Sequence, residues 1–256
     1  MDICSFFFVQ QSYNDVPVRL RQEARQTLSL VDLDLIEQIL QRDESRLLHQ
    51  LLSPAELCYF QRFKYMKRKK EWLGGRIAGK AAILAPSHAN LAAQELLSSI
   101  AILPNRYGRP IAEQLPASLA GQGDEPVISL SHSDGFAVAL ARKGRNCGID
   151  LQEISPRLVG LTSHFAREAE LQRLAEQVDY NEDTHLTMLW TVKEALKKAL
   201  LHDQSVIFSE TELLEISRVN ESVWRFTCAV QEKNQSVLVH FFSPYILSIT
   251  EEEKHA

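Results

Sequence analysis

The sequence predicts an α+β fold of two similar lobes, each an antiparallel sheet packed with helices. Two observations carry this prediction. Strand-like and helix-like segments occur in similar proportion in both halves of the 256-residue chain. Residues 116–126, PASLAGQGDEP, gather Gly, Pro and small residues between the halves. We therefore expect an N-terminal lobe over residues 1–120 and a C-terminal lobe over residues 121–256.

The first half starts with a strand and continues with helices. Residues 4–10 are aromatic-rich and read as a strand, and apolar residues at helical spacing predict a helix over 31–40. The sequence SPAE at 53–56 is a helix start, because the serine caps, the proline fits the first turn and the glutamate completes a capping box. We expect this helix to reach Leu84 with a break near Lys69-Lys70, and another helix over 90–98.

The second half reads as strands, then helices, then strands. The predicted strands are 127–131, 136–141, 146–152, 223–230, 236–242 and 245–250, and the predicted helices are 167–177 and 183–201. The strands 136–141 and 245–249 are both short, apolar and led by an aromatic residue, which favours a duplicated fold.

Composition excludes several classes of protein. With 45% hydrophobic and 24% charged residues, the chain is not a disordered one. It has no apolar run of about 18 residues, and its start lacks the basic region and cleavage site of a signal peptide, so we expect a cytoplasmic protein without a membrane span. Four widely spaced cysteines form no CxxC pair, which argues against a structural zinc site or a redox motif.

The net charge of −5 conceals a basic segment. Residues 62–80 hold eight basic residues against one acid, Glu71. Such a segment attracts phosphate or another polyanion, or it is a solvated helix face.

Three clusters carry groups suited to chemistry. The first, SLSHS at 129–133, ends a strand before the turn Asp134-Gly135. Its hydroxyls and the imidazole of His132 suit a phosphate cradle; a polar turn with local hydrogen bonds is the alternative.

The second cluster is GIDLQE at 148–153. On a strand, Asp150 and Gln152 point to one face and Glu153 to the other. A carboxylate and an amide oxygen on one face can bind Mg²⁺, which takes only one or two protein carboxylates. The alternative is a strand that runs out into an exposed polar loop.

The third cluster is WTVKEALKK at 190–198. Trp190, Glu194 and Lys198 share one face of a helix. Together with Asp150 and the basic segment, they indicate a phosphoryl-transfer site, in which Glu194 is a metal ligand or base. Alone, Glu194 and Lys198 would be a surface pair worth about 0.3–0.5 kcal/mol.

The order of these motifs resembles the Sfp-type 4′-phosphopantetheinyl transferases. The family has a Gly-x-Asp-x-Glu strand followed some forty residues later by Trp-x-x-Lys-Glu-Ala-x-x-Lys, and here 194 − 150 gives 44 residues from Asp150 to Glu194. Residues 53–82 and the YGRP of 107–110 resemble N-terminal segments of the same family, and the likeness runs from about Ser53 to Leu201.

The resemblance implies an enzyme with two similar lobes that are related by a pseudo-twofold axis. It would move the 4′-phosphopantetheine arm of coenzyme A to a serine of an apo acyl or peptidyl carrier protein, with Mg²⁺, and release 3′,5′-ADP. It implies Asp150, Gln152 and Glu194 as metal ligands and Glu194, Lys198 and His132 as catalytic residues. The coenzyme A contacts that it implies are Lys67, Arg76, Gly108, Arg109, Ser131, His132 and Lys198.

One position departs from the family pattern. Gln152 stands where the family has the second acid of Gly-x-Asp-x-Glu, so the metal site has one formal negative charge fewer. We expect altered metal affinity rather than lost activity, with either Gln152 or a water at that position.

Other functions have weaker support in the sequence. Gln152 is the feature that favours a non-catalytic module that binds coenzyme A or a carrier protein. A nucleic-acid patch at 62–80 is disfavoured by the net charge and by the lack of a nucleic-acid motif. The two-lobed length predicts a monomer, and an acidic carrier would be steered by the basic segment.

Overall fold

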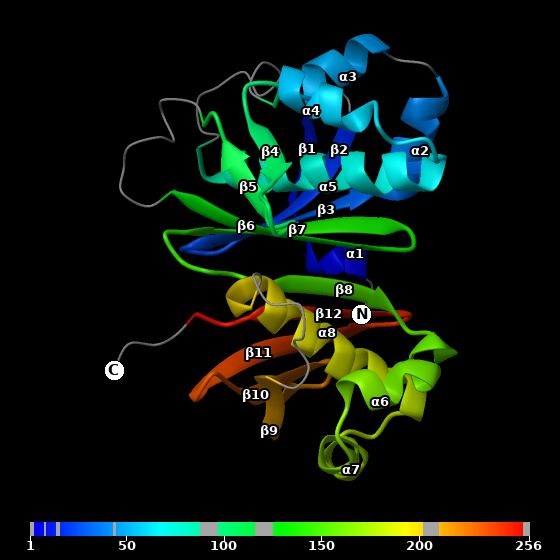
Figure 1. The fold of residues 1–256 in the computed structure, drawn as a ribbon, viewed down its shortest axis with the longest axis vertical. Coiled ribbons are helices and arrows are strands. Elements are labelled where there is room, and N and C mark those ends of the chain that lie inside the picture. Colours follow the sequence, from blue (N-terminus) through cyan, green and yellow to red (C-terminus); the bar gives the residue numbers. More distant parts are fainter. Residues whose placement is uncertain are drawn as a thin grey trace. The chain divides into compact units, whose positions relative to one another are not determined.

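The computed structural model describes residues 3–7, 9–13, 16–42, 45–87, 97–115, 125–201 and 210–252. It divides into two compact units. We call Cys4–Asn146 the N-terminal unit, and Met1–Ile3 with Cys147–Ala256 the C-terminal unit. Each contains a five-stranded sheet whose neighbouring strands are antiparallel, with helices against it, so the predicted α+β class is confirmed (Figure 1).

The sheet of the N-terminal unit has the strand order β1-β2-β3-β7-β6. Its strands are β1 (Val9–Tyr13), β2 (Val16–Gln22), β3 (Gln26–Asp32), β6 (Pro126–Ser133) and β7 (Phe136–Lys143). A two-stranded sheet of β4 (Ala101–Pro104) and β5 (Pro110–Glu113) accompanies it. Its helical segments are α2 (Leu33–Gln41), α3 (Ser45–Leu51), α4 (Pro54–Phe60), α5 (Met66–Leu84) and the 3₁₀ turn η1 (Ala85–Ser87), while α1 (Ile3–Phe6) opens the chain.

The units divide later in the chain than the sequence predicts. The expected boundary lay between residues 120 and 121, but the structure divides between Asn146 and Cys147. The reason is strand pairing, because β7 pairs along β3, with Leu140 opposite Leu28, and β6 pairs with β7. The hairpin that follows the Gly- and Pro-rich stretch therefore completes the first sheet.

Two helical expectations in the first half need correction. The break comes before α5, at residues 61–65, rather than near Lys69-Lys70, and residues 4–10 are not one strand, since α1 precedes β1. The helix expected over 90–98 lies largely outside the described residues.

Helix α5 packs directly on its sheet through glycines. A Cβ atom on Gly74 would lie 2.5 Å from Leu33 Cδ2, and one on Gly79 would lie 2.8 Å from Ile102 Cδ1. Both positions therefore need the smallest residue, because the neighbouring side chains already fill the space. Figure 1 shows α5 in cyan along this sheet.

The sheet of the C-terminal unit has the order β8-β12-β11-β10-β9. Its strands are β8 (Ile149–Glu153), β9 (Thr211–Asn220), β10 (Val223–Val230), β11 (Lys233–Phe242) and β12 (Tyr245–Thr250). Its helical segments are η2 (Pro156–Leu161), α6 (Thr162–Phe165), α7 (Glu168–Gln177) and α8 (Glu182–Leu200). The strands expected at 223–230 and 245–250 are confirmed residue by residue.

Each unit contains a buried ion pair between a lysine and a glutamate, and the two pairs are of the same kind. In the N-terminal unit, Lys80 Nζ donates to Glu56 Oε2 (2.5 Å) and to the carbonyl of Leu51 (2.7 Å). Glu56 Oε2 also accepts from the N–H of Ser53, its helix cap, and Oε1 accepts from Ile102 N–H at the next strand. Lys80 and Glu56 have no exposed side-chain surface.

The C-terminal unit repeats this arrangement. Lys193 Nζ donates to Glu170 Oε2 (2.8 Å) and to the carbonyl of Phe165 (2.7 Å). Glu170 Oε2 accepts from Arg167 N–H, and Oε1 accepts from Leu213 N–H of β9. The carbonyl lies five residues before the glutamate in both units (56 − 51 and 170 − 165). The shared pattern supports the prediction of two similar lobes.

Candidate active site

Asp150 and Lys198 meet in the C-terminal unit. Lys198 Nζ donates to Asp150 Oδ1 (2.6 Å) and to the carbonyl of Ile149 (3.1 Å). Asp150 is 5% exposed, so β8 does not run out into an exposed loop at this point. The Lys198 side chain keeps 27% of its surface exposed, so this ion pair lies at the edge of the unit's interior.

Helix α8 approaches β8 more closely than any side chain would allow. A Cβ atom on Gly148 would lie 1.8 Å from the carbonyl oxygen of Ala195. Only glycine can stand there without displacing the helix backbone. Because Ala195 follows Glu194 directly, this contact holds the turn that carries Glu194 beside the start of β8.

Glu194 lies one helical turn before Lys198 on α8. Its side chain is 17% exposed, and its Oε1 accepts from Lys197 Nζ at 3.4 Å. The expected shared face of Glu194 and Lys198 follows from their four-residue spacing on this helix. The neighbouring Lys193 is fully buried, so α8 is not the surface helix of the alternative interpretation.

A buried hydroxyl pair locks the same helix to the sheet. Thr191 Oγ1 and Ser248 Oγ lie 2.7 Å apart, and both residues are fully buried. Ser248 on β12 is directly opposite Asp150 on β8, so the pair adjoins the Asp150 side chain on one sheet face. Sequence reasoning missed Thr191 and Ser248, although Thr191 lies seven residues before Lys198 on the same helical stripe.

Gln152 lies two residues after Asp150 on the same strand. Gln152 is half-buried on the same strand, and strand alternation puts it on the same face as Asp150 and puts Glu153 on the other. Among the described residues, no group of three or more His, Cys, Asp or Glu side chains could hold a metal ion. Asp150, Glu194 and the Gln152 amide all lie on β8 and α8 of the same unit, and two carboxylates with an amide oxygen fit the chemistry of Mg²⁺, which binds one or two carboxylates and keeps several waters.

The structure places His132 in the N-terminal unit, beside Glu71. His132 Nδ1 lies 3.9 Å from Glu71 Oε1, and the same carboxylate faces Lys67 at 3.9 Å. Ser131 and His132 point to opposite faces of β6, so the two do not form one cradle. A pocket of about 290 Å³ at the end of β6 is lined by Lys67, Glu71 and Ser133, among others, but not by Ser131 or His132.

The cations of the basic segment, residues 62–80, lie in different environments. Lys80 is internal, in its ion pair with Glu56. Arg76 is 8% exposed, and its guanidinium lies 4.4 Å from the centroid of the Trp72 ring. Its Nε is buried without a hydrogen-bond partner among the described residues. Burial lowers the pKa of Arg76 to about 10, against the opposing effect of Glu56.

Four cations of this segment lie over four different aromatic rings. The pairs are Arg62 over Tyr59, Arg68 over Phe63, Lys69 over Phe60 and Arg76 over Trp72, at 5.3, 5.9, 5.9 and 4.4 Å. The rings pack on one another around Trp72. Ring faces attract cations, so these four contacts offset part of the repulsion between the closely spaced positive charges of this segment.

Gly108 and Arg109 belong to a tight turn between β4 and β5. Asn105 Oδ1 accepts from the N–H groups of Tyr107 (2.9 Å) and Arg109 (3.0 Å), and Gly108 has a φ of +84°. The Arg109 guanidinium donates to Asn146 Oδ1 at 3.1 Å. The turn is thus rigid and its arginine is held by the last residue of the unit.

The predicted site residues therefore form two groups. Asp150, Gln152, Glu194 and Lys198 share the C-terminal unit, and Lys67, Arg76, Gly108, Arg109, Ser131 and His132 share the N-terminal unit. His132 and Ser131 were expected in the C-terminal lobe, and the strand pairing of β6 places them in the other unit.

In the described part of the chain, no helix combines the length and apolar character that crossing a membrane requires.

A comparison with protein families finds a match over the residues of the C-terminal unit. Residues 146–250 match the family model described as the 4′-phosphopantetheinyl transferase superfamily. These residues contain Asp150, Glu194 and Lys198, so this part of the chain is similar to the superfamily to which the predicted type belongs. The search of curated proteins finds no match.

Solved structures of holo-(acyl-carrier-protein) synthases are similar to part of the chain. The Bacillus anthracis synthase, in complex with CoA (3′,5′-ADP), is 22% identical with a TM-score of 0.39, covering 46% of this chain and 94% of its own. The Neisseria meningitidis synthase is 20% identical with a TM-score of 0.41, covering 46% and 96%. The Helicobacter pylori synthase, in complex with coenzyme A, is 21% identical with a TM-score of 0.38, covering 46% and 98%.

Proposed function

We propose, from the superfamily match of residues 146–250, that this chain transfers the 4′-phosphopantetheine arm of coenzyme A to a serine of an apo acyl or peptidyl carrier protein. The observation that carries the proposal is that Lys198 contacts Asp150 within the matched residues, with Glu194 one helical turn before Lys198 on the same helix. Within the superfamily, the motif order from Ser53 to Leu201 supports the Sfp type.

In the proposed reaction the serine oxygen forms a bond to the β-phosphorus of coenzyme A, the one that carries the pantetheine arm. The bond from that phosphorus to the bridging pyrophosphate oxygen breaks, and 3′,5′-ADP leaves with the electron pair. Glu194 accepts the serine proton, because it is the partly exposed carboxylate on the face of α8 that also carries Lys198. The Lys198 ammonium stabilises the charge that develops on the leaving phosphate.

The proposed metal would be held by Asp150, Glu194 and Gln152. When bound, Mg²⁺ supplies charge neutralisation for the pyrophosphate. Lys198 already contacts Asp150 Oδ1, so part of the Asp150 charge is balanced by this lysine. With Gln152 in place of an acid, the donor set is weaker than that of the family pattern.

We assign the binding of coenzyme A to Lys67, Arg76, Gly108, Arg109, Ser131 and His132, together with Lys198. Arg76 supports this best, because its Nε is buried without a partner among the described residues and burial lowers its pKa. An anionic phosphate would supply an opposite charge. The exposed Lys67 lines the neighbouring pocket and suits the same ligand.

The decisive experiment mixes the protein, coenzyme A, Mg²⁺ and a panel of apo carrier proteins of different pathways. Transfer adds about 340 Da to the carrier, the mass of the arm in this chemistry, as read by intact mass spectrometry. We expect Glu194→Gln to lower turnover by about 10²–10⁴-fold while coenzyme A still binds, since the amide cannot accept the proton. Glu153→Gln is the matched control, because Glu153 lies on the opposite strand face.

The alternative is a non-catalytic module that binds coenzyme A or a carrier, which Gln152 favours. Coenzyme A binding without mass gain on any carrier would establish that alternative and overturn the transferase. Full turnover by Glu194→Gln would remove this residue from the mechanism. The expected monomeric state and cytoplasmic location stay predictions.

A further inference from the structure

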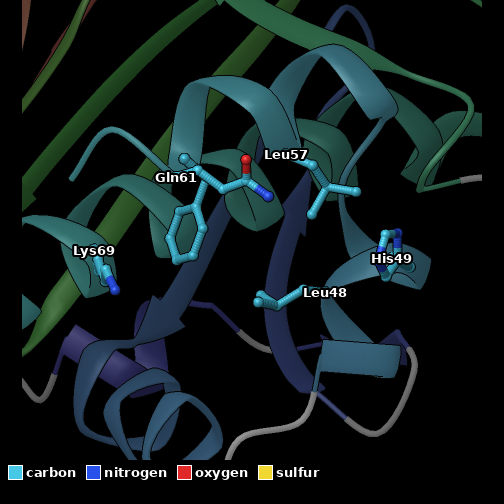
Figure 2. Close-up of a pocket in the computed structure, with 6 residues that line it drawn as sticks. Leu48, His49, Leu57, Gln61 and Lys69 are labelled. Carbon is cyan, nitrogen blue, oxygen red and sulfur yellow. The ribbon is translucent and has the colours of Figure 1, made fainter. Parts of the chain in front are cut away.

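A pocket of about 270 Å³ lies on the N-terminal unit, away from the residues assigned to coenzyme A. Three helices supply its lining: Leu48 and His49 of α3, Leu57 and Phe60 of α4 with Gln61 at its end, and Lys69 of α5. In Figure 2, Leu48 and Leu57 come from neighbouring helices, with Lys69 at the other edge. The volume equals roughly nine waters of about 30 Å³, which suits a few apolar side chains.

Lys69 differs from the cations beside it. Residues 67–70 are four consecutive cations, and three of them pair with acids: Lys67 and Arg68 with Glu71, and Lys70 with Glu37. No acid of the described residues lies within ion-pair distance of Lys69, whose Nζ is 5.9 Å from the centroid of the Phe60 ring. The cation at this pocket is thus the one whose charge is not neutralised.

The described residues 45–70, which include most of the pocket lining, carry more exposed cations than acids. Between residues 45 and 70 the sequence has a single acid, Glu56, and it is fully buried against Lys80. Arg46, Arg62 and Lys64 of the same stretch are exposed. An apolar pocket in a basic surface is complementary to a partner that is both apolar and acidic.

We propose that this pocket docks an acidic amphipathic helix of the carrier protein. Apolar side chains of that helix enter between α3 and α4, and a carboxylate reaches Lys69. A helix fits because the pocket lies between helices, and an apolar helix face laid into such a groove is a recurring recognition mode. The inference rests on the proposed function, which supplies a carrier protein as the partner.

The test compares charge reversal at the pocket with charge reversal beside it. We measure the affinity of fluorescently labelled apo carrier for the whole protein by anisotropy, without coenzyme A. Lys69→Glu should weaken binding by about tenfold, because it adds repulsion as well as removing attraction. Lys64→Glu, an exposed cation of the same stretch outside the pocket lining, should change it by less than about twofold.

Two further variants separate the pocket from general charge effects. Leu48→Gln should weaken carrier binding without changing the net charge, and circular dichroism checks that it folds. A carrier with one acid of its helix changed to lysine should bind Lys69→Glu better than it binds the wild type. The KM for coenzyme A should stay within about twofold in all of these proteins, because none of the changed residues is assigned to coenzyme A.

The outcomes for docking and for transfer are distinguishable. Transfer by the wild type together with unchanged carrier binding in Lys69→Glu and Leu48→Gln overturns the docking proposal and leaves the transferase. Pocket-dependent carrier binding without any transfer supports the docking site and overturns the transferase. Binding of decanoate, but not of carrier, that both variants abolish would make the occupant a small carboxylate and overturn the proposal. If the wild type forms dimers that Lys69→Glu dissociates, and carrier binding is unchanged, the occupant is a second copy of this chain and the docking proposal is also overturned.

Discussion

Gln152 is the residue at which the sequence departs from the pattern of the family that it resembles, and its effect on metal binding can be measured. It follows Asp150 by two residues on β8 and is half-buried, so it presents an amide oxygen on the face of the Asp150 carboxylate. Glu153 is also half-buried but points to the other face. The strand thus offers a test position and a control position one residue apart.

We expect Gln152→Glu to strengthen metal binding. A second carboxylate raises the negative charge of the donor set, and such charge tunes affinity for a hard cation. The Mg²⁺ concentration that gives half-maximal thermal stabilisation should fall by about tenfold, and the concentration for half-maximal transfer should fall with it. Glu153→Gln should leave both unchanged; a response equal to that of Gln152→Glu would show that β8 does not present these residues as proposed.

At the residue scale, the sequence predicts chemistry better than environment. It gives Asp150, Glu194 and Lys198 as candidates, because the strand motif around Asp150 and the helix motif that holds Glu194 and Lys198 are each local. It does not predict that Lys198 contacts Asp150, since that contact depends on how α8 packs on β8. It also treats Arg76 and Lys80 alike as basic, whereas one lies over Trp72 and the other is enclosed with Glu56. Burial is a property of tertiary packing, so a charge run alone does not reveal it.

At the element scale, the two buried lysine–glutamate pairs are matched, but only one adjoins the candidate site. Lys193 directly precedes Glu194 on α8, and its bond to Glu170 fixes the rotation of this helix. Lys80 fixes α5 in the same way, but the residue after it is Ala81. The chain therefore contains its own control for a link between helix rotation and catalysis.

Lys80→Met and Lys193→Met should both destabilise the protein by about 3–5 kcal/mol, because each leaves a buried carboxylate without its partner. Under conditions where both variants are folded, only Lys193→Met should also lower the rate of transfer at saturating substrate. Urea unfolding gives the stability, and mass spectrometry of the carrier gives the rate. Equal rates for the two variants would show that the pair acts on stability alone.

The pair of Lys80 and Glu56 also predicts how the stability of the protein depends on pH. Burial lowers the pKa of Lys80 from 10.5 to about 8, against the opposing effect of Glu56. Between these values the unfolded chain holds a proton that the folded chain has lost, so unfolding takes up a proton and stability rises with pH. The cost of burying the protonated Lys80 lowers the free energy of unfolding in full below pH 8. This cost disappears as the pH reaches 10.5. Wild type should therefore gain stability relative to Lys80→Met across this window, as urea titrations at each pH measure; a constant difference would contradict the lowered pKa.

Elements formed by local signals are the ones that the sequence predicts well. The capping box of Ser53 and Glu56 is present as expected, and β10 and β12 match because each alternates or is uniformly apolar. The Gly- and Pro-rich stretch predicts a loop, but it does not predict which strand the next strand pairs with, so the structure divides the units at a later residue. The pairing of β7 with β3 joins residues more than a hundred positions apart, and no local pattern encodes it.

At the scale of the whole molecule, the two units have separate apolar cores. One core contains residues from Val16 to Ala141, grouped around α5, and the other contains residues from Leu158 to Ile246, grouped around α8. Each core is therefore confined to one unit as the chain is divided. Chains with separate cores often depart from a single cooperative transition.

We expect calorimetry of the whole protein to resolve two unfolding steps. Lys80→Met should lower the midpoint of one step and Lys193→Met that of the other, because each ion pair lies in a different unit. Mg²⁺ alone should raise only the step that Lys193→Met lowers, since a ligand stabilises the unit that binds it and all three proposed metal ligands lie in the C-terminal unit. One indivisible transition that both variants shift equally would mean that the two cores unfold together, and the buried pairs would then act on a single cooperative structure.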